Sequence, residues 1–395
     1  MPRLITSYLS KATAGAACRH AQPPQKRRSQ PHLPEDRTMR LAASLLLLAI
    51  ATPLMAEPEQ LNLYNWADYV APQALARFQA ETGIRVKYDT FDSTEVLESK
   101  LLIGGSGYDL VFPASSGLAR AIQAGALQPV GELKHAGNLD AELLAKLASV
   151  DPGNRFGVPY TWGTVGLGLN RQALEQRLPG VALDSLDLLF RPEYASKLKD
   201  CGIAVLDSPQ EVIAIALNYL GKDPYSNAAE DLEAARALLA GLQPNLRYVG
   251  SARHIDDLAN GSLCLALTYT GDAGMAAAHA AEAGQPFEVV YRIPREGTLI
   301  WFDTMAIPAD APNPEAARAF IDFMLQPEAI AELSNALFFA NANAAATPLL
   351  DEAVSGDPDI YPPAAVRERL FPEQVQGPRE QRQRTRLWTA FRSQY

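Results

Sequence analysis

Leu61-Asn62-Leu63-Tyr64-Asn65-Trp66-Ala67-Asp68-Tyr69, residues 61–69, is the stretch that decides the fold. Its first half alternates apolar and polar side chains, which is typical of a half-buried strand. Its second half brings two aromatic rings and a carboxylate, from Trp66, Asp68 and Tyr69, to the end of that strand. In an open α/β sheet, ligands bind beyond the carboxyl ends of the strands. A carboxylate between two rings suits an organic cation better than an anion, because ring faces and acids both attract positive charge.

The residues that follow alternate between helix and strand patterns. A helix is predicted over 72–83, with proline in its first turn and glycine at its end, and a strand over 84–88. Asp92 and Glu95 form a predicted capping box for the next helix, and 108–112 is typical of a buried strand. This order predicts a mainly parallel sheet with flanking helices, an α/β fold.

The α/β pattern resumes after residues 158–163, which we interpret as a crossing between two lobes. A strand over 202–206 and a helix over 209–220 follow, and a return crossing is predicted near 293–297. Two α/β lobes joined by two crossings would leave a hinge and a central cleft. The predicted lobes are 57–163 with 298–325, and 164–297 with 326–395.

The first 56 residues have the composition of segments that lie outside a folded domain. Residues 1–38 are rich in Arg, Lys, Pro, Ser and Gln, which predicts disorder. Residues 39–56 combine a basic start, a short apolar run and a small-residue site at Ala56, which predicts a secretory signal peptide and a periplasmic location. Met39 is then the expected initiator; an unusually long basic region before the apolar run is the alternative.

The net negative charge of the chain favours a cationic partner and disfavours nucleic acid. The chain has 35 basic and 45 acidic residues, a formal net charge of −10. Residues 1–56 contain eight of the basic and two of the acidic side chains, so their removal leaves 27 and 43 and a net charge of −16. Such a protein repels nucleic acid and anionic lipid headgroups and attracts cations.

Cysteine usage agrees with export. Cys18 lies in the predicted leader, which leaves Cys201 and Cys264. Two cysteines in an oxidising compartment predict one disulfide; two free buried thiols are the alternative. No Cys-x-x-Cys motif or Cys/His cluster is present, so neither a metal site nor a cofactor is predicted.

Seven short motifs, in order and with similar spacing over residues 60–395, together resemble the polyamine-binding periplasmic proteins of ABC transporters, most closely their putrescine-binding branch. They are Asn65-Trp66-Ala67-Asp68-Tyr69, Gly107-Tyr108-Asp109-Leu110-Val111, Tyr160-Thr161-Trp162-Gly163-Thr164, Leu217-Asn218-Tyr219-Leu220-Gly221, Gly271-Asp272, Trp301-Phe302-Asp303 and Ala340-Asn341-Ala342-Asn343.

The resemblance implies a two-lobed, type II periplasmic binding protein, most simply a monomer, that delivers a linear polyamine to an inner-membrane permease. It implies that Glu211 holds an ammonium group at one end of the ligand and that Asp303 is the main diammonium partner. The full ligand set that it implies is Trp66, Asp68, Tyr69, Ser115, Glu211, Tyr269, Asp272, Trp301, Asp303 and Phe339.

Several positions depart from the family pattern. Ala67 and Ala114 stand where hydroxyl residues are usual, although Ser115 follows directly. Tyr269 replaces Trp, and Trp301 and Phe339 replace Phe and Tyr; the preferred amine is therefore open among putrescine, spermidine, cadaverine and agmatine.

Each acid also has a purely structural interpretation. Glu211 follows Ser208 at capping-box spacing, and Asp272 precedes an Ala-rich helix that it could cap. Asp68 could form an Asx turn. Asp303 is harder to explain in this way, because it lies in an otherwise apolar run where an unpaired acid is costly.

Enzymatic functions find little support. The chain has no Gly-x-Ser-x-Gly elbow and no phosphate loop, and His135, His254 and His279 have no metal-ligand spacing and are expected at the surface or at helix caps. Carboxylates among aromatic rings also occur in glycosidase clefts, so a carbohydrate-active enzyme is the catalytic alternative. The non-catalytic alternative is a polyamine-sensing protein that serves a receptor.

Overall fold

The computed structural model describes residues 59–67, 69–91 and 93–393. The predicted extension, the predicted signal peptide, Asp68 and Asp92 therefore lie outside the described residues. Within the described ranges, no helix is both long and apolar enough to cross a membrane.

The first α/β segment contains three parallel strands with helices between and after them. In chain order these are β1 (Gln60–Trp66), α1 (Pro72–Thr82), β2 (Arg85–Phe91), α2 (Thr94–Ile103), β3 (Leu110–Val111) and α3 (Ser115–Gln123). β1 lies between β2 and β3 and is parallel to both, as the sequence predicts. The predicted cap of α2 is wrong by one residue, because Ser93 is the N-cap and its side chain accepts a hydrogen bond from Val96 N at 3.3 Å.

A second α/β segment follows β5 (Gly157–Asn170). Its elements are α5 (Arg171–Arg177), α6 (Asp187–Phe190), α7 (Pro192–Leu198), β6 (Ile203–Val205), α8 (Pro209–Tyr219), α9 (Ala229–Leu242), β7 (Tyr248–Val249), α10 (His254–Ala259), β8 (Leu265–Tyr269), α11 (Thr270–Glu282) and β9 (Val289–Arg292). β6 is parallel to β7 and β8, whereas β8 and β9 are antiparallel to β5.

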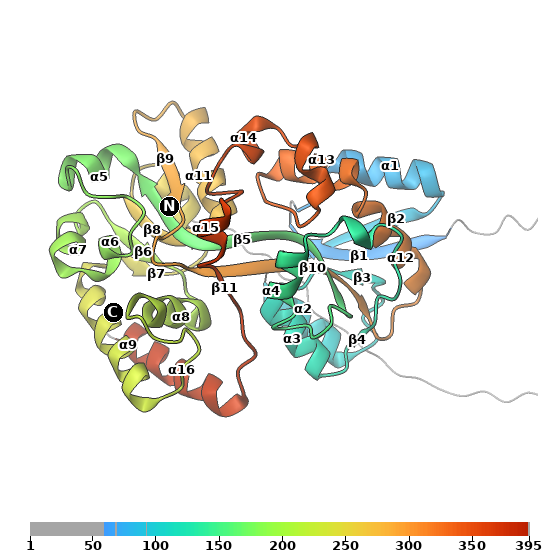
Figure 1. The fold of residues 1–395 in the computed structure, drawn as a ribbon, viewed down its shortest axis with the longest axis horizontal. Helices are drawn as coiled ribbons and strands as arrows, with labels where there is room; N and C mark the ends of the chain where they lie inside the picture. The colour runs from blue at the N-terminus through green and yellow to red at the C-terminus, as the bar shows by residue number, and fades with distance from the viewer. Residues whose placement is uncertain (1–58, 68, 92, 394–395) are drawn as a thin grey trace, which may run out of the picture. The chain divides into compact units, whose positions relative to one another are not determined.

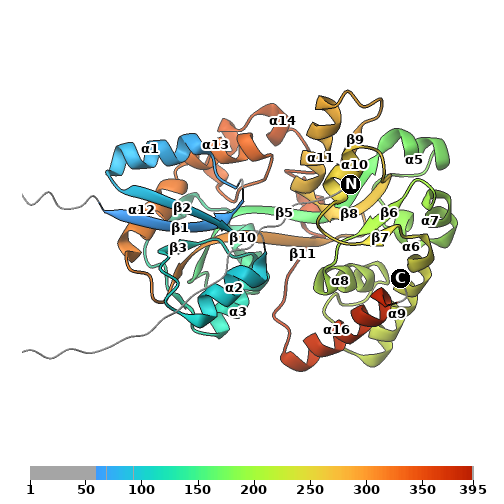
Figure 2. The same cartoon turned by 180° about the vertical axis from the view of Figure 1, so that it is seen from behind.

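Two long antiparallel strands, β5 and β10 (Leu299–Pro308), join the two segments (Figures 1 and 2). The strand order is β2-β1-β3-β10-β5-β8-β6-β7. The first predicted crossing, 158–163, lies inside β5. The second, 293–297, lies just before β10, so the predicted return crossing is a few residues too early. A continuous apolar strand gives no sequence signal for the point at which it passes from one half to the other.

The other elements surround this framework. They are β4 (Leu127–Gln128), α4 (Ala141–Leu147), α12 (Pro314–Met324), α13 (Pro327–Leu337), α14 (Glu352–Ser355), α15 (Ala364–Arg367), β11 (Phe371–Pro372) and α16 (Pro378–Arg392). α16 packs on α8 and α9, whereas α13 packs on α1. The predicted lobe boundaries stay a prediction, and the packing of α13 argues for placing it with the first lobe rather than the second.

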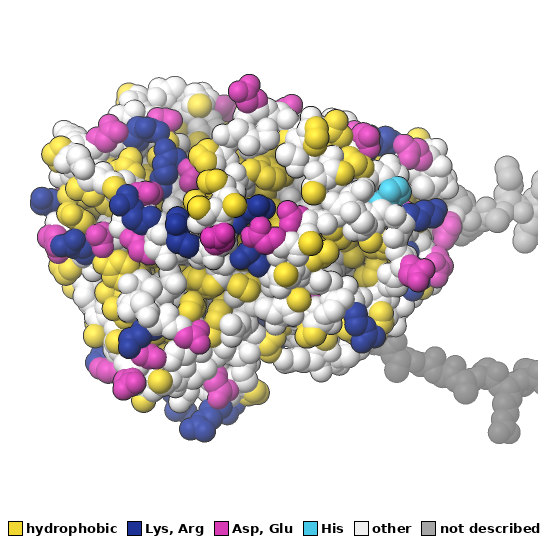
Figure 3. Space-filling model, viewed as in Figure 1, with side chains coloured by type: hydrophobic (Ala, Val, Ile, Leu, Met, Phe, Trp, Pro, Cys, Tyr) yellow, Lys and Arg dark blue, Asp and Glu magenta, His cyan; other side chains and the backbone are white. Residues whose placement is uncertain are grey.

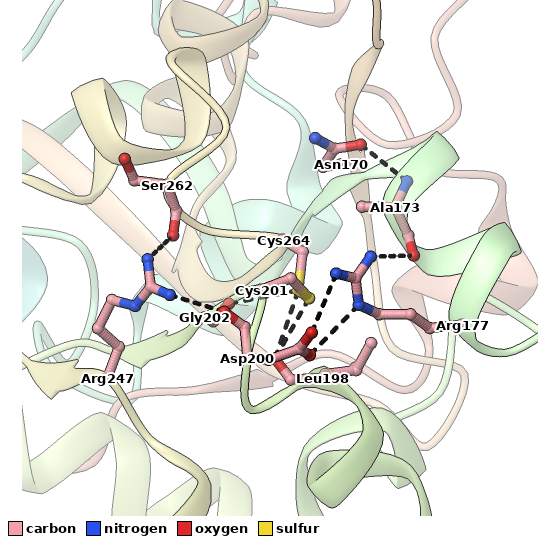
Figure 4. Close-up of a disulfide and its surroundings, with 10 residues drawn as sticks. All are labelled: Asn170, Ala173, Arg177, Leu198, Asp200, Cys201, Gly202, Arg247, Ser262 and Cys264. Carbon is pink, nitrogen blue, oxygen red and sulfur yellow. Dashed lines mark hydrogen bonds and ion pairs between the residues drawn. A yellow bond between two sulfur atoms is a disulfide. The ribbon is translucent and has the colours of Figure 1, made fainter.

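The predicted disulfide between Cys201 and Cys264 is confirmed, with Cα atoms 5.6 Å apart (Figure 4). It links the residues just before β6 to those just before β8. Nearby, the Arg177 side chain contacts the Asp200 carboxylate at 3.4 Å. The bridge thus fixes neighbouring strands at the end opposite to Tyr269, the last residue of β8.

Candidate ligand-binding site

The predicted ligand residues are positioned by the carboxyl ends of parallel strands. Trp66 ends β1, Tyr269 ends β8, and Glu211 lies in the first turn of α8, which follows β6. Trp301 and Asp303 belong to β10, which runs between the two halves of the sheet. This is the edge at which an open α/β sheet binds ligands. Asp68 lies outside the described residues, so its place at this edge stays a prediction.

Asp303 provides one end of the site. Its side chain is only 8% exposed, and this burial raises the pKa of the carboxyl to about 7, while Tyr69 and Trp66 partly offset the effect. It forms no ion pair with a described residue. The buried Trp66 Nε1 likewise has no hydrogen-bond partner among the described residues. A buried acid that lacks a cationic partner is what a bound ammonium group would neutralise.

The Tyr69 ring lies beside this carboxylate and is held in place. Its hydroxyl is 2.5 Å from Thr161 Oγ1, and Tyr160 donates a hydrogen bond to the Tyr69 carbonyl at 3.0 Å. Burial, followed by the negative charge of Asp303, raises the pKa of Tyr69 well above its usual value. The tyrosine is therefore neutral and presents its ring and hydroxyl next to Asp303.

Glu211 provides the other end. It is 8% exposed, and its Oε2 accepts a hydrogen bond from the Tyr269 hydroxyl at 2.7 Å. Burial raises the pKa of Glu211, and the nearby Asp272 raises it further, whereas hydrogen bonds from Tyr269 and Ser208 act in the opposite direction. Ser208 is the N-cap of α8 but makes no side-chain capping bond. The capping box that would have explained Glu211 structurally is therefore not formed.

Asp272 lies in the first turn of α11 and is held by a histidine. Its Oδ2 is 2.8 Å from His254 Nε2. His254 is 1% exposed and Arg253 is the N-cap of α10, so the expectation that His254 lies at the surface or at a helix cap is wrong. It opens α10, which packs against α11, and this tertiary contact left no signal in the sequence spacing. Tyr269, not Asp272, is the N-cap of α11.

Four aromatic rings connect the two ends. Tyr69 contacts Phe339 with ring centroids 5.2 Å apart, Phe339 contacts Trp301 at 5.8 Å, and Trp301 contacts Tyr269 at 6.2 Å, each edge to face. Phe339 also lies against Gly271, where an added Cβ would stand 1.9 Å from the ring. The rings thus form a continuous apolar wall between Asp303 and Glu211, suited to the methylenes of a linear ligand.

Ser115 has a different environment from the other predicted residues. Its Oγ donates to the Phe302 carbonyl at 3.1 Å and accepts from the Phe302 amide at 2.8 Å. These bonds attach the start of α3 to β10, one residue before Asp303. The geometry supports a role for Ser115 in placing β10; a contact with the ligand stays a prediction.

A cavity of about 970 Å³ lies elsewhere, between α11, β9 and the segment around α14 and α15. Its lining mixes both charge signs, and Arg292 is paired with Asp359 at 2.7 Å. Because the Asp359 carboxylate is paired with Arg292 and further arginines line this cavity, it is less suited to a dication than the Asp303–Glu211 site. Figure 3 shows acidic and basic side chains interspersed over one face of the molecule, so no single-sign field dominates that face.

Known proteins share both the sequence and the fold. The family model for bacterial extracellular solute-binding proteins matches residues 73–362. The putrescine-binding periplasmic protein PotF of Escherichia coli is 46% identical over 357 residues, covering 89% of this chain and 96% of that protein. The putrescine-binding periplasmic protein SpuD of Pseudomonas aeruginosa is 43% identical over 362 residues, covering 90% of this chain and 99% of that protein.

Among solved structures, the spermidine/putrescine ABC transporter substrate-binding protein PotD from Streptococcus pneumoniae superposes with a TM-score of 0.75 at 29% identity. The superposition covers 85% of this chain and 99% of that chain. The predicted resemblance to polyamine-binding periplasmic proteins is confirmed by these relatives, and so is the two-lobed α/β fold.

Proposed function

Because this chain belongs to the bacterial extracellular solute-binding proteins, we propose that it binds a linear polyamine between its two α/β halves and delivers it to an ABC permease. The relatives described above are named for binding putrescine or spermidine. They are solute-binding proteins rather than enzymes. Nothing in the described residues favours the sensing protein or the carbohydrate-active enzyme over this function.

One observation carries the proposal: two buried carboxylates, Asp303 and Glu211, lie at opposite ends of a wall of aromatic rings. A buried ammonium needs a paired acid. A carboxylate about 4 Å away supplies roughly 4 kcal/mol at an effective dielectric near 20. An aromatic face adds about 0.5–2 kcal/mol. Two such ends select a ligand by the distance between its ammonium groups.

The setting of this function is part of the same proposal, and the periplasmic location of the relatives supports it. The protein acts in the periplasm, to which the signal peptide at residues 39–56 directs it. It acts as a monomer and hands the polyamine to an inner-membrane permease, without a cofactor and without nucleic acid. Closure of the two halves around the dication gives the permease a ligand-loaded form to recognise, because the bound cation contacts both halves at once.

Calorimetric titration with a panel of small molecules tests the proposed function. We expect at least one of putrescine, cadaverine, agmatine and spermidine to bind with a Kd below about 10 μM, which corresponds to roughly 7 kcal/mol. Butylamine, with one ammonium, should bind at least tenfold more weakly, since it leaves one buried carboxylate unpaired. Succinate, which carries two carboxylates, is the matched control and should not bind. Tight succinate binding, or no binding by any of the four amines, would contradict the proposal.

A further inference from the structure

A buried histidine lies behind one of the predicted ligand residues, Asp272. His254 Nε2 is 2.8 Å from Asp272 Oδ2. The exposed fraction of the side chain is 2% for His254 and 24% for Asp272. His254 is the first residue of α10, and Asp272 lies in the first turn of α11, which packs beside α10 (Figure 2). The histidine is thus the buried partner of this pair, and the carboxylate is the accessible one.

The hydrogen bond in this pair runs from the imidazole to the carboxylate. An ionised carboxylate only accepts hydrogen bonds, so Nε2 carries the proton. The other ring nitrogen, Nδ1 of His254, is buried and has no hydrogen-bond partner among the described residues. A second proton, on Nδ1, would create a buried cation with an N–H donor that has no acceptor, which is costly. The ring therefore donates one hydrogen bond and carries no charge, and Asp272 keeps its negative charge.

This bond selects one orientation of Asp272 among those that the start of a helix allows. Asp272 is the third residue of α11, and the backbone N–H groups of a first helical turn have no partner within the helix. An Asp side chain at such a position can turn back and accept from these groups. The N-cap of α11, Tyr269, makes no side-chain capping bond, so this competing orientation is open. The bond to His254 opposes it, and because it uses only Oδ2 it leaves the second carboxylate oxygen for a ligand.

The backbone at the start of α11 is fixed by other contacts. Thr270 Oγ1 accepts a hydrogen bond from the Thr164 amide at 3.0 Å and donates one to the Thr164 carbonyl at 3.1 Å. The Phe339 ring lies against Gly271 and leaves no room for a Cβ there. β5 and the aromatic wall therefore set the position of the backbone. What remains free at this point is the rotation of the Asp272 side chain.

The orientation of Asp272 matters because its charge reaches the ligand site. Burial, then the Glu211 carboxylate and then Asp272 raise the pKa of Tyr269 well above its usual value. Burial raises the pKa of Glu211 as well, and Asp272 adds to that effect. Attraction between a carboxylate and an ammonium falls with the distance between them. A rotation of Asp272 away from the site would therefore weaken its hold on a cation bound beside Tyr269.

We propose that His254 is a positioning residue for polyamine binding, whose Nε2–H holds the Asp272 carboxylate in the orientation that faces an ammonium group of the ligand. This inference rests on the proposed function and deepens it, because it assigns a role to a residue that does not touch the ligand. A cationic side chain in the place of His254 would pair with Asp272 and compete with the ligand. An uncharged donor orients the acid and leaves its charge available.

Two substitutions of His254 test this role by calorimetric titration with putrescine. His254→Phe keeps a ring of similar size and removes the donor, so we expect the affinity to fall at least fivefold. His254→Gln places an amide N–H close to the position of Nε2 and should restore the affinity to within about threefold of wild type. Rescue by a donor of different shape is a result that a space-filling role of His254 would not produce. His279→Phe is the matched control, since His279 is 48% exposed and its replacement should leave the affinity unchanged.

A double-mutant cycle with Asp272→Asn separates positioning from a general loss of structure. Asp272→Asn alone should weaken putrescine binding at least fivefold. Adding His254→Phe to that variant should lower the affinity less than twofold further, because no charge is left to position. An undiminished effect of His254→Phe in this background, or an unchanged affinity of Asp272→Asn, would overturn the inference and leave the proposed function intact.

Nuclear magnetic resonance of protein labelled with nitrogen-15 histidine tests the contact without measuring affinity. The His254 signals, identified by their absence from the His254→Gln spectrum, should show a proton on Nε2 and none on Nδ1 at pH 7, with and without putrescine. A proton on Nδ1 would overturn the inference, even if His254→Phe does not fold. Should the wild-type protein bind none of the amines, the proposed function fails, and the role of His254 fails with it.

Discussion

An Asp303→Asn variant should bind a linear diamine at least tenfold more weakly than the wild-type protein. Asp303 is a buried acid without a cationic partner among the described residues, and an ammonium placed there gains a charge-assisted contact in a low-dielectric site. The amide keeps the size of the side chain but removes its charge. Calorimetric titration with putrescine measures the loss. An unchanged Kd would exclude Asp303 from the site.

The same variant changes how affinity depends on pH. Because the pKa of Asp303 is about 7 in the ligand-free protein, the carboxylate that the ammonium needs is lost as the pH falls below about 7. Wild-type affinity should therefore decrease between pH 8 and pH 5. Asp303→Asn should show a shallower slope, with the remainder coming from other acids such as Glu211, whose pKa is also raised.

The Asp303→Asn substitution should stabilise the ligand-free protein, although it weakens ligand binding. The carboxyl of Asp303 has a pKa near 3.8 when unfolded and about 7 when folded, a difference worth about 4 kcal/mol. Between these two pH values the folded protein holds a proton on Asp303 that the unfolded protein has lost. The free energy of unfolding therefore falls as the pH rises, and the full loss is reached above about pH 7. The ligand-free variant should therefore melt at a higher temperature than wild type at pH 8. Asp256→Asn is the matched control, because the Asp256 side chain is 81% exposed and should affect neither property.

Replacing both Cys201 and Cys264 by Ala should lower the free energy of unfolding by about 4 kcal/mol. The bridge closes a loop with a sequence separation of 63, and such a cross-link restricts the unfolded chain. Chemical denaturation of the oxidised wild-type protein and the variant measures the difference. Polyamine affinity should stay within about threefold, because Cys264 lies five residues before Tyr269, about 17 Å along a strand.

Reductant provides the control for the disulfide prediction. Treatment with dithiothreitol should bring the stability of the wild-type protein close to that of the double variant and leave the variant unchanged. A double variant as stable as oxidised wild type would show that the bridge contributes nothing. A large loss of affinity would show instead that the bridge positions the ligand residues at the far end of β8.

The fold, and the positions of several candidate site residues within it, were predictable because they depend on local patterns. Alternation in 61–66 and the turn residues that follow each strand give the β-α-β-α-β order, and the strand-end rule brings Trp66, Glu211 and Tyr269 to one edge. The position of Asp303 in an apolar run of the sequence marks it as a buried charge.

Features that depend on tertiary packing were not predictable from the same patterns. His254 meets Asp272 only because α10 packs on α11, and nothing in their sequence separation indicates it. The packing of α13 on α1 similarly reflects a contact between segments that lie far apart in the sequence.

A crystal structure of the protein with putrescine is the most direct measurement of where the ligand binds. One ammonium should lie within about 3 Å of an Asp303 carboxylate oxygen and the other close to Glu211 or Asp272, with the methylenes against Trp301 and Phe339. Density for putrescine in the cavity beside Arg292 and Asp359, with Asp303 and Glu211 facing no ammonium, would contradict the proposed site.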